Sequence, residues 1–174
     1  EQIGAPLGCC LRGLSAVPTD HRRFLGMQGM HGHYASSMAM HHADVIIALG
    51  VRFNDRVTGD RTKFAEDKKI IHIDVDGSEL CKNVQEVCGL RGDIKLTLNR
   101  LLPLLEKSEK PDWQAQIETL RSKERGYADN RPGMTPRRIL STLNRYLGEN
   151  TAVCTDVGQH QTWAAQNIRS QMPR

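Results

Sequence analysis

The stretch that decides the fold is VIIALGVRFNDRVTG, residues 45–59. Its apolar start predicts a buried strand, because short runs rich in β-branched residues are typical of sheet cores. Gly50 ends this strand, and Arg52, Asp55 and Arg56 follow within a few positions. In open α/β sheets, ligands bind just beyond the carboxyl ends of the strands. The stretch therefore predicts an α/β fold with a ligand site in the loop 50–59.

The arginines of this loop have two interpretations. A planar guanidinium fork suits phosphate or carboxylate groups, so Arg52 and Arg56 could hold a phosphorylated cofactor. Asp55 lies between them, and an Arg–Asp pair can instead hold a loop closed. The spacing alone favours neither interpretation.

Strand-like and helix-like segments alternate along the first hundred residues. Residues 69–75 form a second β-branched run, and residues 34–42 carry apolar side chains at helical spacing. Asp93 is placed to cap a helix whose apolar face continues to residue 105. This alternation predicts a doubly wound, mostly parallel sheet with helices on both faces. The weaker signals predict a strand at 6–11, a loop at 13–24, a helix starting at Ser78 and a strand at 87–90.

The pattern changes after residue 105, where a charged and polar segment begins. Thr135 followed by Pro136 is a strong helix start, because threonine caps well and proline suits the first helical position. We expect a central domain at 1–105, truncated at its N-terminus, a linker at 106–134, and the beginning of a second α/β domain at 135–174. The second domain is predicted as a helix, a strand at 151–155, a loop at 156–160 and a helix at 162–168.

Composition excludes several classes of protein. The 174 residues are 39% hydrophobic and 25% charged, which is typical of a globular protein. The net charge of +4 is not gathered into a basic block, so we expect no nucleic-acid partner. No apolar run approaches the roughly 18 residues of a membrane span, so we expect no membrane contact. Five unevenly spaced cysteines indicate reduced thiols. The first residues carry no targeting signal, and both ends read as cuts in a longer protein.

A glycine-rich segment, residues 26–32, precedes the first predicted helix. Its glycines allow a ligand to approach the backbone closely and leave amides exposed at the helix start, although such segments are usually simple turns. Nearby histidines could suggest a metal, but no acidic residue or cysteine lies at a metal-like spacing. We therefore predict no metal ligands in the chain and retain only His31 as a possible cofactor contact.

Two further strand ends carry polar residues. Asp74 ends the predicted strand at 69–75, a position where an acidic residue accepts a hydrogen bond from a ribose hydroxyl in dinucleotide folds. The chain has no GxGxxG fingerprint, which argues against an ordinary nicotinamide site. Residues 156–161, DVGQHQ, could present free amides to a diphosphate, or could be an ordinary loop.

Taken together, these motifs resemble the catalytic subunit of acetohydroxyacid synthase, also called acetolactate synthase. The resemblance covers essentially the whole chain and is weakest between 106 and 134. It rests on LGMQGMHG (25–32), GVRFNDRVTG (50–59), HIDVD (72–76), GD (92–93) and TDVGQHQTWAAQ (155–166).

The resemblance implies three cofactors: thiamine diphosphate, FAD and Mg²⁺. The positions matching FAD contacts are Leu11, Arg12, Gly29, Met30, His31, Gly50, Val51, Arg52, Asn54, Arg56, Val57, Asp74, Val75 and Asp93. The positions matching the thiamine diphosphate loop are Val157, Gly158, Gln159 and His160. Met30, Asp55 and Arg56 also match the family's substrate channel.

The chain departs from the family at several positions. Cys10 replaces a usual Thr beside the flavin, Asn54 replaces a usual Asp, and Gln28 and His33 replace an apolar residue and a Thr. By the resemblance, the catalytic glutamate, the first βα unit of the central domain and the Mg²⁺-binding motif lie outside these residues. We therefore expect no catalytic residue in this chain and no activity from it alone.

The resemblance also implies the reaction and the partners. The whole enzyme would condense pyruvate with a second 2-keto acid, pyruvate or 2-ketobutyrate, in branched-chain amino-acid biosynthesis. It would form a homodimer or higher oligomer, could bind a regulatory small subunit, and would be cytoplasmic in a bacterium or organellar in a eukaryote. The alternatives are a nucleotide-binding module with a structural or regulatory role, and a related thiamine-dependent enzyme such as glyoxylate carboligase.

Overall fold

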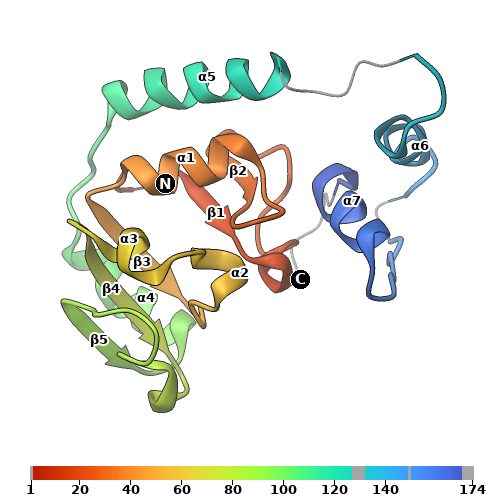
Figure 1. The fold of residues 1–174 in the computed structure, drawn as a ribbon. Coiled ribbons are helices and arrows are strands. Elements are labelled where there is room, and N and C mark those ends of the chain that lie inside the picture. Colours follow the sequence, from red (N-terminus) through yellow and green to blue (C-terminus); the bar gives the residue numbers. More distant parts are fainter. Residues whose placement is uncertain (1, 127–131, 149, 170–174) are drawn as a thin grey trace.

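The computed structural model describes residues 2–126, 132–148 and 150–169. Parts of the predicted linker and second domain, residues 127–131, 149 and 170–174, lie outside this description. Strands and helices alternate along the first half, and helices follow alone in the second half (Figure 1). The strands are β1 (Leu7–Cys9), β2 (Phe24–Met27), β3 (Val45–Leu49), β4 (Lys69–Asp74) and β5 (Cys88–Arg91). The α-helices are α1 (Tyr34–His42), α2 (Asp55–Thr58), α3 (Arg61–Ala65), α4 (Ile94–Leu101), α5 (Pro111–Gly126), α6 (Pro136–Leu143) and α7 (Gln159–Asn167). The 3-10 turns are Leu11–Gly13, Gly77–Glu79 and Leu102–Leu104.

All strand pairs are parallel. β1 pairs with β2 in one sheet, and β3, β4 and β5 form a second sheet with β4 in the middle. The β3–β4 register runs from Val45 opposite Lys69 to Leu49 opposite Ile73. The carboxyl ends of the three strands therefore meet at one edge. The predicted α/β class with parallel strands and helices is confirmed.

The core of the larger sheet lies on one of its faces. Ile46, Ala48 and Ile70 are buried there, and Phe64 of α3 packs against them. Full burial of such aliphatic side chains contributes about 1.5–3 kcal/mol each. The alternate residues of β3 are 38–44% exposed, so the prediction of a fully buried strand is wrong for that face. The cause is that no described element covers those side chains completely.

The second core joins α1 to α5, which run side by side (Figure 1). Ile117 and Leu120, one helical turn apart on α5, are buried with Leu25 of β2 and with Ala35 and Ala39 of α1. The Arg121 guanidinium also donates to the carbonyl of Phe24 at 3.0 Å. The predicted linker thus contains helix α5, which packs against α1 and β2. The division into domains stays a prediction.

Several local predictions need correction. Residues 151–155 form no strand, because no strand of the described residues pairs with them, and their side chains are exposed. The expected helix at Ser78 is only the 3-10 turn Gly77–Glu79. β2 spans the end of the predicted loop 13–24 and the start of the glycine-rich segment 26–32, where no strand was predicted, and it is held by pairing with β1. Helix α7 begins at Gln159, inside the predicted loop.

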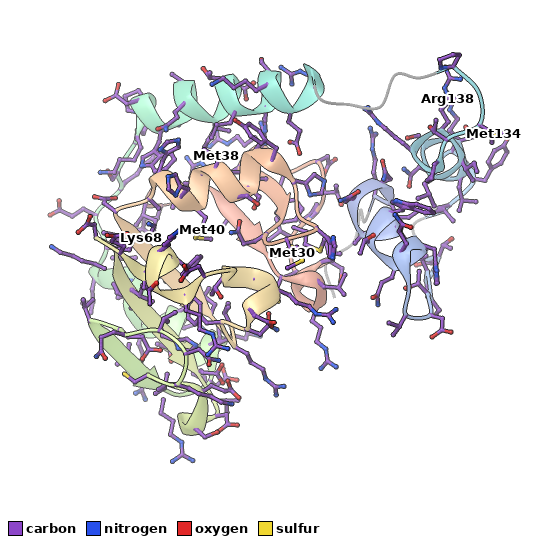
Figure 2. The ribbon with its side chains drawn as sticks, in the orientation of Figure 1. Met30, Met38, Met40, Lys68, Met134 and Arg138 are labelled. Carbon is purple, nitrogen blue, oxygen red and sulfur yellow. The ribbon has the colours of Figure 1, made fainter. Side chains whose placement is uncertain are left out.

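The last two helices contact each other. Thr135 caps α6 as predicted, accepting from the amide of Arg138 at 3.3 Å. Asn144, just after α6, donates to the carbonyl of Asn167 at 2.7 Å and thereby joins the ends of both helices. Figure 2 shows Met134 and Arg138 at this outer part of the molecule, away from the two sheets.

Candidate functional site

The predicted flavin residues all follow the carboxyl ends of strands. Leu11 and Arg12 lie in the 3-10 turn after β1, and residues 29–31 follow β2. Residues 50–57 follow β3, Asp74 ends β4 with Val75 behind it, and Asp93 follows β5. Ligand sites of parallel sheets occur at this edge, so the topology places the predicted residues where a cofactor would bind.

Backbone hydrogen bonds tie the first three strand ends together. The amide of Gln28 donates to the carbonyl of Cys9 at 2.7 Å, which links the ends of β1 and β2. The amide of Met30 donates to the carbonyl of Arg56 at 2.9 Å, which links the loop after β2 to α2. The two sheets therefore share one continuous rim at the carboxyl ends of their strands.

Gly29 makes this second link possible. Its φ is +106°, a conformation that glycine adopts without the steric cost of a side chain. A Cβ there would lie 2.3 Å from the carbonyl oxygen of Arg56. Only glycine lets the loop approach α2 this closely.

The loop 50–59 is partly helical. Gly50, with φ of +64°, turns the chain out of β3, and the side chain of Asn54 caps α2 by accepting from the amide of Val57 at 3.2 Å. Phe53 has a φ of +45° and is buried against Phe64 and His72. The expectation of an irregular loop is therefore wrong for Asp55–Thr58, because Asn54 supplies the helix cap.

Arg52 points largely into solvent. Its Nε lies 3.8 Å from Oε1 of the buried Glu79, which also accepts a hydrogen bond from Lys82 at 2.9 Å. Among the described residues, no ion pair joins Asp55 to Arg52 or to Arg56. The interpretation of an Arg–Asp pair that closes the loop therefore finds no support, and Arg52 keeps an exposed guanidinium at the rim.

The strand ends of β4 and β5 present two aspartates in different ways. Asp74 is buried, and its Oδ1 accepts the amide of Asp76 at 2.9 Å. Asp93 is exposed and caps α4 through the amide of Leu96 at 2.9 Å. Val75, beside Asp74, is 70% exposed. An ordered carboxylate beside an exposed apolar side chain is chemically suited to a ribose next to a planar ring.

Exposed apolar side chains recur along this rim. Met30 is 70% exposed and lies on the side of the sheets that faces α7 (Figure 2). Leu11 and Val75 are also exposed, at the ends of other strands. Apolar side chains with only a few polar groups among them are the usual lining of cofactor sites. The donor set and the exposed apolar groups both fit an extended dinucleotide.

The second predicted site lies at the start of α7. Gly158 is the residue before the helix, and no side chain caps the helix amides among the described residues. Uncapped amides at a helix start bind anions well, since they combine free donors with the positive end of the helix dipole. Val157 is 82% exposed, and Gln159 and His160 are exposed as well. The loop is open to a diphosphate group.

The comparison with protein families decides the identity of the fold. Residues 1–101 match the model of the "Thiamine pyrophosphate enzyme, central domain". The chain belongs to this family.

Relatives with established names agree with this family. The chain is 38% identical over its full length to the large subunit of acetolactate synthase isozyme 3 from Escherichia coli K12, of which it covers 32%. It is 39% identical over its full length to the acetolactate synthase large subunit of Corynebacterium glutamicum, covering 29% of it. Identity to the large subunit of E. coli isozyme 2 is 41% over 97% of the chain. The chain spans about a third of the length of the relatives it matches.

Two residues that the resemblance predicts to depart from the family pattern, His33 and Cys10, lie beside the predicted site in this thiamine pyrophosphate enzyme domain. His33 accepts from the amide of Met27 at 3.0 Å through Nδ1, and its Nε2 lies 3.2 Å from the carbonyl oxygen of Gln166 on α7. Gln166 in turn donates to the carbonyl of His31 at 2.8 Å. The loop after β2, which contains several predicted flavin positions, is therefore in direct contact with α7, the helix of the predicted diphosphate site. Sequence reasoning did not predict this contact.

The second of these residues, Cys10, belongs to a pair of adjacent cysteines. Cys10 precedes the 3-10 turn after β1, and its neighbour Cys9 lies in the strand. Burial, together with the charge of Cys10, raises the pKa of Cys9 to about 12. All five cysteines are free thiols. Cys9 is therefore a half-buried thiol beside the rim that stays protonated at neutral pH.

Sequence reasoning also missed His72 and Glu86, which meet in the interior of this thiamine pyrophosphate enzyme domain. His72 is fully buried in β4, and its Nδ1 lies 2.6 Å from Oε1 of Glu86. Their separation of fourteen residues gave no local signal.

The structure adds two negative findings. Within the described ranges, no group of three or more His, Cys, Asp or Glu side chains is arranged to hold a metal ion. No helix in the described parts of the chain is both long and apolar enough to cross a bilayer.

Proposed function

We propose that this chain is part of a thiamine-diphosphate-dependent carboligase of the acetolactate synthase type. The observation that carries the proposal is the uncapped, exposed start of α7, with Gly158 at its head, in a chain whose first part is a thiamine pyrophosphate enzyme central domain. The names of the relatives support acetolactate synthase over other thiamine enzymes. The proposed reaction is condensation of pyruvate with a second 2-keto acid, pyruvate or 2-ketobutyrate, for branched-chain amino-acid biosynthesis.

The diphosphate of the thiamine cofactor would be held by Val157, Gly158, Gln159 and His160. The cofactor supplies the electron sink needed to decarboxylate a 2-keto acid and transfer the remaining two-carbon unit. The role of this loop is to hold the phosphates, since amides at a helix start favour negative charge. We propose that Mg²⁺ completes this site through ligands outside the 174 residues, and that the catalytic residues also lie outside them.

The rim of the sheets would hold FAD in an extended pose. Arg52 would bind the phosphates, Asp74 would accept a ribose hydroxyl, and the exposed Met30 and Val75 would contact flat rings. FAD would stabilise the site and undergo no net redox change. Met30, Asp55 and Arg56 would border the path of the substrate. The remaining proposed flavin contacts are Leu11, Arg12, Gly29, His31, Gly50, Val51, Asn54, Val57 and Asp93.

The proposal extends to the assembly. The whole enzyme would be a homodimer or higher oligomer, with a possible regulatory small subunit, and would reside in the bacterial cytoplasm or in an organelle. We expect the 174-residue chain alone to form no acetolactate from pyruvate.

The diphosphate loop provides the test. We would substitute Gln159→Glu in the full-length enzyme and titrate thiamine diphosphate while acetolactate formation from pyruvate is measured. A new carboxylate beside the diphosphate should weaken cofactor binding at least tenfold, because like charges would meet at the helix start. Gln114→Glu, the same change on the exposed surface of α5, is the matched control. Equal cofactor affinities in both variants, or carboligation of glyoxylate in place of pyruvate, would overturn the proposal.

A further inference from the structure

The interior of the larger sheet contains a chain of ionisable groups that the proposed function does not use. His72 lies at the middle of β4 with no exposed surface, and Glu86 and Asp74 lie on two sides of its ring. Phe53 packs edge-on against the same ring with a centroid distance of 5.2 Å. A histidine fixed this completely between two carboxylates requires an explanation.

Glu86 determines the orientation of the ring. Its Oε2 accepts hydrogen bonds from the amide of Cys81 at 2.8 Å and from the Cys81 thiol at 3.0 Å. These bonds fix the carboxylate on the side away from His72. Burial opposes ionisation of Glu86, but the hydrogen bonds from Cys81 and His72 outweigh it and lower the pKa of this group. An ionised Glu86 2.6 Å from Nδ1 places a proton on that nitrogen, which donates to the carboxylate.

The other ring nitrogen faces the rim of the sheet. His72 Nε2 is buried and makes no hydrogen bond within the described residues, and Oδ2 of Asp74 lies 3.8 Å from it. Oδ1 of Asp74 is already occupied by the amide of Asp76. Buried polar atoms are normally paired, and a bare lone pair beside a carboxylate would be repelled by it. A small rotation of Asp74 would instead let Nε2–H donate to Oδ2.

We propose that His72 is the positioning residue for Asp74, with Glu86 holding its ring, so that Asp74 presents a fixed carboxylate to the ribose hydroxyls of an adenine nucleotide. This inference rests on the proposed function, because it assumes that Asp74 faces the ribose of FAD. It adds two residues behind the binding surface that touch no ligand. Among the residues that the structure describes, Glu86, Asp74 and Phe53 face His72, and Cys81 contacts Glu86 on its other side.

The test uses full-length apoenzyme, with ADP and 2′-deoxy-ADP as probes, and FAD titrated alongside. We would compare the wild type, His72→Gln, Glu86→Gln and the control His41→Gln, which makes the same change at an exposed histidine of α1. Loss of one hydrogen bond to a charged group corresponds to about a tenfold change in affinity. We expect the wild type to prefer ADP by about that factor, and both interior variants to lose the preference, whereas His41→Gln keeps it.

A purely structural role for His72 would weaken both probes equally and leave their ratio unchanged, which would overturn the proposal. Nitrogen-15 spectra of histidine-labelled wild type give an independent readout that requires no folded variant. A hydrogen bond between Nε2 of His72 and the carboxylate of Asp74 is expected in these spectra, and its absence would also overturn the proposal. If the wild type binds neither probe, the flavin assignment fails and the ribose role fails with it; binding with an unchanged ratio defeats this inference alone.

Discussion

Gly29→Ala is the substitution whose effect the structure defines most sharply. The new Cβ would lie 2.3 Å from the carbonyl oxygen of Arg56, whereas real Cβ contacts are essentially never shorter than 3.0 Å. The loop must therefore move away from α2, and the hydrogen bond from Met30 to Arg56 is lost. Alanine would also have to adopt a φ near +106°. The substitution therefore acts on the contact between the loop after β2 and α2, which links the two sheets.

The magnitude follows from separate contributions. Backbone strain at such a dihedral costs about 1–3 kcal/mol. Loss of the hydrogen bond adds about 0.5–1.5 kcal/mol, and the collision with a backbone carbonyl adds to this. Gly133→Ala is the matched control, because its φ of +100° is similar and, apart from its chain neighbours, no described residue lies within 4 Å of its Cβ position. We therefore expect Gly29→Ala to lose about 2 kcal/mol more stability than Gly133→Ala.

Thermal unfolding followed by circular dichroism measures the difference. About 2 kcal/mol corresponds to a separation of about 4–8 °C between the two melting temperatures in a chain of this size. Equal melting temperatures for the two variants would refute the reasoning, since the close approach to Arg56 would then have no energetic consequence.

Three further predictions follow from single residues. The pKa of Glu86 is lowered in the folded state from its ordinary value of 4.5. Its ionised form therefore stabilises the folded protein above pH 4.5, and this stabilisation is lost as the pH falls through the lower pKa of the folded state. The melting temperature of Glu86→Gln should therefore lie below that of wild type at pH 7 and converge with it below pH 4.5; a constant difference would contradict this. Cys9, with a pKa of about 12, should react with iodoacetamide at pH 8 far more slowly than the exposed Cys88 and Cys154, as read by peptide mass spectrometry, and equal rates in the folded protein would be inconsistent with its burial. Thr135→Ala should lower the unfolding free energy by about 1 kcal/mol, whereas Thr135→Ser restores most of it; no loss would mean that this cap is unimportant.

Local sequence signals predicted the elements that depend on local physics. β3 and α1 appear with the expected bounds, and the caps at Asp93 and Thr135 form as expected. These features depend on residues within a few positions of one another. The glycine-rich segment 26–32, the loop 50–59 and Asp74 were named as candidate site residues from local signals, whereas Leu11, Arg12 and Asp93 were named as cofactor contacts only by the family resemblance.

The errors concern structure that depends on distant partners. β2 contains a glycine and is a strand only because β1 lies beside it, whereas residues 151–155 have strand-forming side chains and no partner strand in the described chain. The hydrogen bond from Met30 to Arg56 and the pair of His72 with Glu86 join residues far apart in sequence. No pattern in a single sequence specifies such pairs.

We propose that this chain is part of a thiamine-dependent carboligase that also holds FAD. The most direct measurement is acetolactate formation from pyruvate by the full-length enzyme after removal of all cofactors, with thiamine diphosphate, FAD and Mg²⁺ restored together or with one omitted each time. The account predicts full activity only with all three present. Undiminished acetolactate formation without thiamine diphosphate would contradict it.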